Sequence, residues 1–96
     1  MANTTKEAKN FYQLERVTKG FASHRRIQIM ELLAKEPELS VEEITERLEI
    51  NYKTAADHVR RLAIAGLIMK RSDGFSVRQK LTPRGETILA FLRKLE

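Results

Sequence analysis

The sequence predicts a small, mainly α-helical domain with one β-hairpin, in the order α-α-α-α-β-β-α. Three observations predict this fold class. The 96 residues suffice for one domain and hardly for two. Apolar residues recur at helical spacing as far as Ala65, and an alternating pattern then surrounds Asp73 and Gly74. We expect residues 1–6 to be disordered and residues 7–96 to form a single domain.

Apolar spacing and end signals indicate the first two helices. The apolar residues of the first helix, three or four positions apart, are Phe11, Leu14, Val17 and Phe21. Gly20 is a stop signal for this helix. Ser23 can cap the second helix, which Pro37 closes because the residue before a proline is pushed away from helical geometry.

The next two helices, within residues 41–65, predict a helix-turn-helix. Ser40 and Glu43 form a capping box, which starts the first of the pair. Asn51 can cap the second, so about three residues separate the two helices. The apolar stripe of the second helix, spaced by four and three, is Ala55, Val59 and Leu62.

Residues 67–81 alternate between apolar and polar side chains, which predicts a hairpin. A loop of residues 72–74 is favoured over a two-residue loop, because it gathers the apolar side chains on one face. That register pairs Met69 with Val77 and Leu67 with Gln79.

Thr82 and Pro83 start a final helix over residues 83–95. A hairpin that directly follows a helix-turn-helix is the arrangement of a winged helix-turn-helix, in which residues 67–81 are the wing.

The net charge of +5 falls in one part of the chain. Residues 51–80 hold seven Lys and Arg against two Asp, whereas residues 1–50 hold eight cations against nine carboxylates. This distribution indicates a local surface for a polyanion. A solvated basic face without a partner is the open alternative.

The chain resembles ArsR-type repressors over about residues 20–85. Residues 23–33 (SHRRIQIMELL) resemble their second helix, and residues 39–50 the first helix of their helix-turn-helix. Residues 51–68 are similar to their recognition helix and its exit into the wing. Residues 81–85 (LTPRG) are similar to the junction after the wing in MarR- and PadR-like winged helices. The resemblance implies a sequence-specific regulator of transcription that binds double-stranded DNA and acts as a repressor.

Helix geometry assigns the candidate DNA contacts. At about 100° per residue, the side of helix 52–65 opposite Ala55 faces away from the core and fits a major groove. The candidates on and before this helix are Asn51, Tyr52, Lys53, Thr54, Ala56, Asp57, Arg60 and Arg61. Tyr52, Lys53, Ala56 and Asp57 lie near the N-terminal end of the helix, where base edges are usually reached. Lys53 can donate to guanine, Ala56 can touch a thymine methyl, and Asp57 can accept from cytosine or repel wrong sites. Thr54, Arg60 and Arg61 suit phosphates, and so do the backbone N–H groups that follow Asn51.

The wing supplies four more candidates, for the DNA backbone or the minor groove: Lys70, Arg71, Arg78 and Lys80. Their alternative role is to keep an exposed hairpin edge soluble. Ile64 falls on the exposed side of its helix, where we expect another element or a partner subunit to cover it. An isolated surface isoleucine is the alternative.

Both terminal helices carry more apolar residues than one small core needs. ArsR-like proteins pair through their first and last helices, so the resemblance implies a homodimer. The candidate interface residues are Phe11, Leu14, Ile88, Phe91, Leu92 and Leu95. Packing of both helices within one chain is the alternative.

Other functions find little support. There is no cysteine, and the only histidines, His24 and His58, have no clustered partners, so we expect no metal site and no cofactor. No catalytic constellation is visible, so we expect no enzyme activity. No apolar run approaches the roughly 20 residues of a membrane span, and the polar N-terminus lacks a signal peptide, so we expect a cytoplasmic protein.

An effector, if any, is unknown. A protein-interaction module, for which the acidic residues 31–49 can dock a basic partner, and a non-specific architectural DNA-binding protein are the rival functions.

Overall fold

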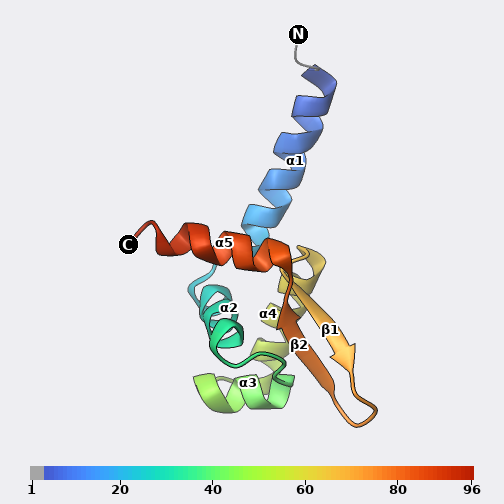
Figure 1. Ribbon diagram of the computed structural model, residues 1–96, viewed down its shortest axis with the longest axis vertical. Coiled ribbons are helices and arrows are strands. Elements are labelled where there is room, and N and C mark those ends of the chain that lie inside the picture. Colours follow the sequence, from blue (N-terminus) through green and yellow to red (C-terminus); the bar gives the residue numbers. More distant parts are fainter. Residues whose placement is uncertain (1–3) are drawn as a thin grey trace.

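A computed structural model describes the backbone of residues 4–96 and the side chains from residue 10 onward. The order of elements is the predicted one (Figure 1). The elements are α1 (Thr4–Phe21), α2 (His24–Lys35), α3 (Val41–Leu48), α4 (Tyr52–Ile64), β1 (Ile68–Ser72), β2 (Val77–Leu81) and α5 (Pro83–Arg93). None of these helices is both long enough and apolar enough to cross a bilayer.

The predicted caps start four of the helices. The hydroxyl of Ser40 accepts from the backbone N–H of Glu43 at 3.1 Å, and the Glu43 carboxylate accepts from the Ser40 N–H at 2.9 Å. Asn51, Ser23 and Thr82 cap α4, α2 and α5 through their side-chain oxygens, which accept from backbone N–H groups two or three positions further along the chain. Each cap satisfies N–H groups that have no partner within the helix, which defines where the helix begins.

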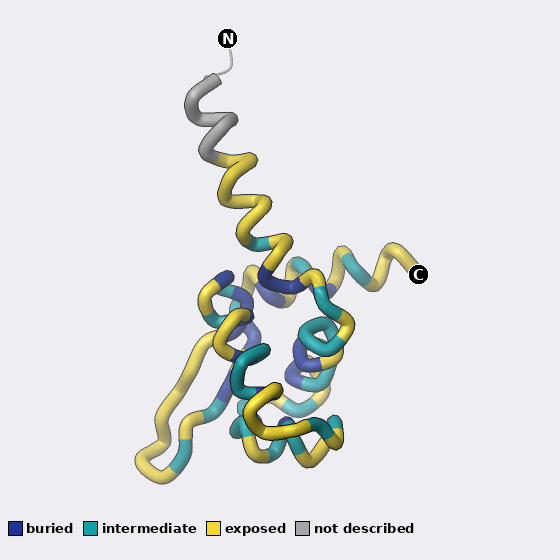
Figure 2. Tube along the Cα trace, turned by 180° about the vertical axis from the view of Figure 1, so that it is seen from behind, coloured by how far each residue is buried: buried dark blue, intermediate teal, exposed yellow. Residues whose placement is uncertain are grey.

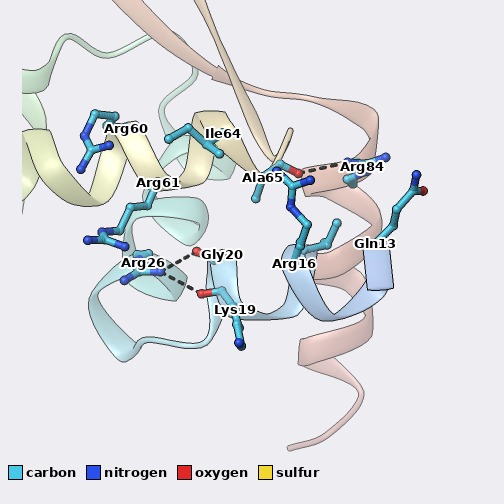
Figure 3. A pocket seen from close by; sticks show the side chains of 11 residues that line it. Gln13, Arg16, Lys19, Gly20, Arg26, Arg60, Arg61, Ile64, Ala65 and Arg84 are labelled. Carbon is cyan, nitrogen blue, oxygen red and sulfur yellow. Dashed lines mark hydrogen bonds between the residues drawn. The ribbon is translucent and has the colours of Figure 1, made fainter. Parts of the chain in front are cut away.

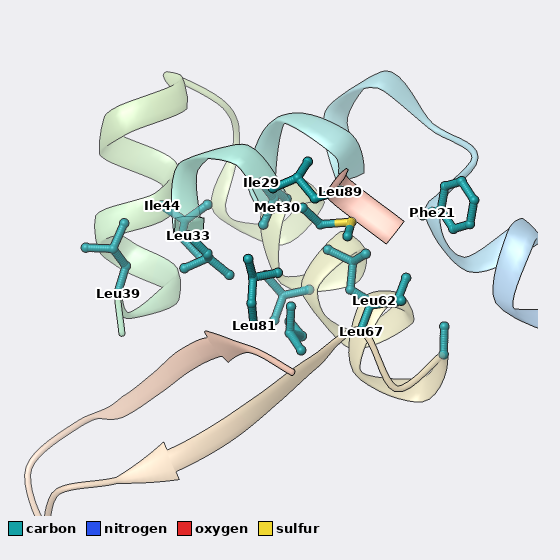
Figure 4. Close-up of a cluster of buried hydrophobic side chains, with 13 residues drawn as sticks. Phe21, Ile29, Met30, Leu33, Leu39, Ile44, Leu62, Leu67, Leu81 and Leu89 are labelled. Carbon is teal, nitrogen blue, oxygen red and sulfur yellow. The ribbon is translucent and has the colours of Figure 1, made fainter. Parts of the chain in front are cut away.

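One apolar core joins α2, α3, α4, the base of the hairpin and α5 (Figure 4). The predicted stripe of α4, formed by Ala55, Val59 and Leu62, is buried. The other large buried apolar side chains are Ile29, Met30, Leu33, Leu39, Ile44, Leu67, Ile68, Leu81 and Leu89. The side of α4 that carries Ala55, Val59 and Leu62 therefore faces the core.

Helix α1 leaves the body of the fold and extends beyond it (Figures 1 and 2). It begins at Thr4, so residues 4–6 of the segment expected to be disordered are helical, and residues 1–3 lie outside the described residues. Only its last turn reaches the core, through Phe21 and the partly buried Val17. Phe11 and Leu14 remain 68% and 60% exposed.

The predicted hairpin register is wrong. Ser72 pairs with Val77 and Ile68 with Leu81, so the loop has four residues, 73–76, where the sequence favoured three. Met69 therefore lies opposite Lys80, and both Met69 and Val77 are exposed. Only the base of the hairpin contributes to the core.

Two polar interactions explain this register. The carboxylate of Asp73 accepts from the N–H groups of Phe75 and Ser76 at 3.1 and 2.9 Å, which stabilises the longer loop. The N–H of Gln79 donates to the carbonyl of Leu39 at 2.7 Å and ties β2 to the segment before α3. The alternation of apolar and polar residues gives no sign of either interaction, so it could not predict which residues pair.

Gly85, buried in the first turn of α5, provides a test of this packing. A Cβ at this position would overlap the carbonyl oxygen of Leu67 and crowd Leu81. We expect Gly85→Ala to lower the free energy of unfolding by about 3 kcal/mol, measured by urea denaturation. Gly74→Ala is the control, because a Cβ there meets no atom within 4 Å and only the positive φ is strained. It should cost about 1 kcal/mol. Equal losses would contradict the close approach of α5 to the hairpin.

Candidate nucleic-acid interface

The exposed side of α4 is set by its buried side. Glu49, in the left-handed conformation with φ 54°, ends α3, and α4 begins three residues later. Because Ala55, Val59 and Leu62 face the core, the opposite side is open to solvent. The exposed residues at its start and along this side are Asn51, Tyr52, Lys53, Thr54, Arg60 and Arg61, with Ala56 and Asp57 partly buried.

The start of α4 offers fewer free N–H groups than the sequence suggested. The side-chain oxygen of Asn51 accepts from the N–H of Lys53 at 2.8 Å and from that of Thr54 at 3.3 Å. Two of the donors considered for a phosphate are therefore engaged by the cap. The side chains of Tyr52 and Lys53 remain exposed beside it.

Asp57 holds two arginines of α4. Its carboxylate lies 2.7 Å from a guanidinium nitrogen of Arg60 and 3.1 Å from one of Arg61. The hydrogen bonds from Arg60 and Arg61 keep the pKa of Asp57 below its usual value, so it stays a carboxylate. The three residues carry a net charge of +1, and Asp57 aligns both guanidinium groups along one face.

The four cations of the wing fall into two pairs. Arg71 donates to the carboxylate of Glu38 at 2.7 Å. Arg78 donates to Asp73 at 2.9 Å and to the carbonyl oxygen of Glu38 at 2.9 Å. These arginines hold the hairpin against the segment between α2 and α3. Lys70 and Lys80 are exposed and form no ion pair with the described side chains.

His58 makes a contact that sequence reasoning missed. Its Nδ1 accepts from Nε of Arg26 at 3.2 Å, and a terminal nitrogen of Arg26 donates to the carbonyls of Lys19 and Gly20 at 3.0 and 2.9 Å. Arg26 thus connects α4 to the end of α1. The two partners are 32 positions apart, and no local pattern marks such a pair. Burial, with the positive charge of Arg26, lowers the pKa of His58.

The candidate dimer residues divide by exposure. Ile88 and Leu92 pack partly on the core, whereas Phe91 and Leu95 are 54% and 66% exposed, like Phe11 and Leu14 on α1. The fold therefore leaves four of the six apolar side chains uncovered. Ile64 is also exposed, so no described residue covers it.

No group of three or more His, Asp and Glu side chains within the described part of the chain is placed to hold a metal ion.

Comparison with known proteins identifies this class of fold. The chain is similar to the homodimeric winged helix-turn-helix DNA-binding domain of Mb0332 from Mycobacterium bovis, with a TM-score of 0.87 and 27% identity over 99% of this chain and 88% of the other. It is also similar to HlyU from Vibrio cholerae, with a TM-score of 0.78 and 30% identity over 91% and 95% of the two chains. The transcriptional repressor PagR of Bacillus anthracis shares the fold, with a TM-score of 0.78 at 20% identity over 88% and 98%. The architecture is thus that of winged helix-turn-helix transcription regulators.

The family follows from the sequence. Residues 23–70 match the bacterial regulatory protein, arsR family. The chain belongs to this family, as its resemblance to ArsR-type repressors predicted. A search of curated proteins finds no significant match.

The His58 contact predicts a pH dependence of stability. Because the pKa of His58 in the folded protein lies below its ordinary value of 6.5, the unfolded chain binds this proton more readily. The contribution of neutral His58 to the free energy of unfolding should therefore be complete above pH 6.5, and it should fall as the pH drops below this value. We expect the free energy of unfolding to decrease between about pH 7.5 and about pH 5.5, measured by urea denaturation.

The decrease should be smaller in His58→Gln, whose amide can still accept from Arg26 but does not titrate. His24→Gln, at the exposed first residue of α2, is the control and should retain the wild-type decrease. The same decrease in all three proteins would contradict the assignment to His58.

Proposed function

We propose that the protein is a homodimeric repressor that reads the major groove of its operator with α4 and contacts the flanking backbone or minor groove with the wing. The observation that carries this proposal is the division of α4 into a buried apolar side and an exposed side with Lys53, Arg60 and Arg61. A helix of this shape fits the roughly 12 Å width of the major groove.

Different parts of α4 serve different contacts. Tyr52, Lys53 and Ala56 lie toward the N-terminal end, where recognition helices usually reach base edges. Asp57 orients Arg60 and Arg61, which suit phosphates, and Thr54 can add a hydroxyl donor. Base preference should therefore depend on the first turn and a half, and overall affinity on the second half of the helix.

The wing combines rigidity with charge. Arg71 and Arg78 hold it in place, and Lys70 and Lys80 supply cations that no described carboxylate neutralises. We assign the direct contacts with DNA mainly to these two lysines. The exposed part of the Arg71 side chain can make a further contact with DNA.

The dimer rests on the exposed apolar residues of both terminal helices. Their burial against a second copy would remove four large side chains from water. The similar domain of Mb0332 is described as homodimeric. Two recognition helices about 34 Å apart would then meet successive major grooves of a palindromic site. Repression follows if the bound dimer blocks access to a promoter, as the ArsR resemblance implies.

Selection from random duplex DNA tests the function. Enrichment of a palindrome with half-sites about one helical turn apart is the expected result. Salt-sensitive binding without enrichment would favour an architectural role. Absence of binding at low salt would overturn DNA recognition and favour a protein-interaction module.

Separate roles for Lys53 and Lys70 form a second prediction. Lys53→Ala should cost about 1–3 kcal/mol at one base position and relax the preference there. Lys70→Ala should weaken binding to all sequences alike and reduce the salt slope by about one unit. Titrations of operator and random DNA at several salt concentrations distinguish the two. Equal losses on both DNAs for Lys53→Ala would contradict base reading.

The dimer interface gives a third prediction. Leu14→Asp and Phe91→Asp each place a charge among apolar side chains and should shift the protein to monomers in sedimentation equilibrium. Phe75→Asp is the matched control, because Phe75 is fully exposed at the tip of the wing and outside both terminal helices. Dimers that persist in both interface variants, or dissociation in the control, would contradict this interface.

A further inference from the structure

A basic cavity of about 500 Å³ lies where α1, α2, α4 and α5 meet (Figure 3). Six of its eleven lining residues are cationic, and none is acidic: the cations are Arg16, Lys19, Arg26, Arg60, Arg61 and Arg84. Apolar surface comes from Val17, Ile64 and Ala65. The cavity thus combines apolar surface with an excess of cationic over acidic lining residues.

Two described carboxylates offset part of this charge, both from outside the cavity. Asp57 pairs with Arg60 and Arg61, and Glu15 pairs with Lys19, but neither carboxylate lines the cavity. Arg16 makes no ion pair with the described side chains. Cations held close together repel one another, and an anion between them relieves that repulsion.

Hydrogen bonds keep two of the cations at the wall. Arg84 donates to the carbonyl of Ala65 at 3.0 Å, and Arg26 donates to the carbonyls of Lys19 and Gly20 (Figure 3). Each guanidinium retains further N–H donors. The site is therefore partly organised before any ligand binds, which reduces the cost of ordering it.

The cavity and the exposed apolar residues lie on neighbouring sides of α1. Gln13, Arg16, Val17, Lys19 and Gly20 line the cavity. At about 100° per residue, Leu14 projects about 60° from Val17, and Phe11 projects about 80° from Lys19. Neither Phe11 nor Leu14 lines the cavity, so the two surfaces adjoin without sharing a residue of α1.

We propose that the cavity binds a small organic anion with an apolar body, and that its occupation weakens DNA binding. The volume lies in the range of small-molecule sites, about 300–1,000 Å³. Val17 and Ile64 suit the body of such a ligand, and Arg16 with Arg84 suits a carboxylate, sulfonate or phosphate group. The effect on DNA rests on the proposed function, because Arg60 and Arg61 face both the cavity and the phosphates assigned to them.

Fluorescence titration with 8-anilinonaphthalene-1-sulfonate tests the site without DNA. We expect saturable binding with one probe per chain, and much weaker binding of N-phenyl-1-naphthylamine, which lacks the sulfonate. Arg16→Ala should weaken sulfonate binding about tenfold, the equivalent of one charge-assisted hydrogen bond. Ile64→Asn should weaken binding of both probes.

Two matched variants separate this cavity from other surfaces. Lys35→Ala removes one exposed cation at the end of α2 and should leave the titration unchanged. Leu14→Ser alters the exposed apolar side of α1 and should also leave it unchanged. The proposal is overturned if the neutral probe binds equally well, if Leu14→Ser abolishes binding, or if Arg16→Ala has no effect.

Titrations with DNA then test the coupling. A saturating concentration of 8-anilinonaphthalene-1-sulfonate, at constant ionic strength, should weaken operator binding by the wild-type protein about tenfold. The same addition should weaken operator binding by Arg16→Ala much less. If Arg16→Ala itself lowers DNA affinity and reduces the salt slope by about one unit, Arg16 contacts a phosphate and the effector assignment is wrong. If the wild type binds no DNA, the proposed function and the coupling both fail, while the probe titration still decides the ligand site.

Discussion

The burial of one side of α4 is the constraint on which the other features depend. Ala55, Val59 and Leu62 are closed off from solvent by α2, α3 and the base of the hairpin. The helix cannot rotate about its axis without exposing this stripe, at a cost of about 25 cal/mol for each Å² of apolar surface. Its orientation, and hence the direction in which Lys53 and Arg60 project, is therefore fixed by the core and not by the polar residues themselves.

Ion pairs decide which cations remain available for a polyanion. Counting Lys and Arg in residues 51–80 treats all seven as equivalent, yet Arg60 and Arg61 share the carboxylate of Asp57. Arg71 and Arg78 are engaged by groups of the α2–α3 connection and by Asp73. Exposed ion pairs contribute little stability individually, but several of them joined with backbone contacts restrict a hairpin that has few core residues. Glu38 thus helps to hold the wing in place through Arg71, although the two residues are more than 30 positions apart in the sequence.

The elements that were predictable from sequence are those determined by local interactions. Capping by Ser40 and Asn51 involves residues two or three positions apart, so the helix boundaries follow from short patterns. The hairpin register depends on Asp73 in the loop and on the distant Leu39, and apolar alternation alone gave the wrong pairing. The exposed side of α4 was predictable for the same reason as its caps, because a helical period places Lys53 opposite the buried stripe. The contact between Arg26 and His58 could not be predicted from the sequence, because only the tertiary fold brings α2 and α4 together.

Helix α1 contributes to three parts of the molecule: the core, the basic cavity and the exposed apolar surface. Its last turn packs on the core through Phe21, one side lines the basic cavity, and another presents Phe11 and Leu14 to solvent. Arg26 joins the end of α1 to His58 on α4 through hydrogen bonds, so a tilt of α1 would be transmitted to α4. In the proposed dimer, paired through α1 and α5, the same tilt would change the separation of the two α4 helices. The proposed ligand would therefore act in two ways, by competing for Arg60 and Arg61 and by altering the spacing that two half-sites require.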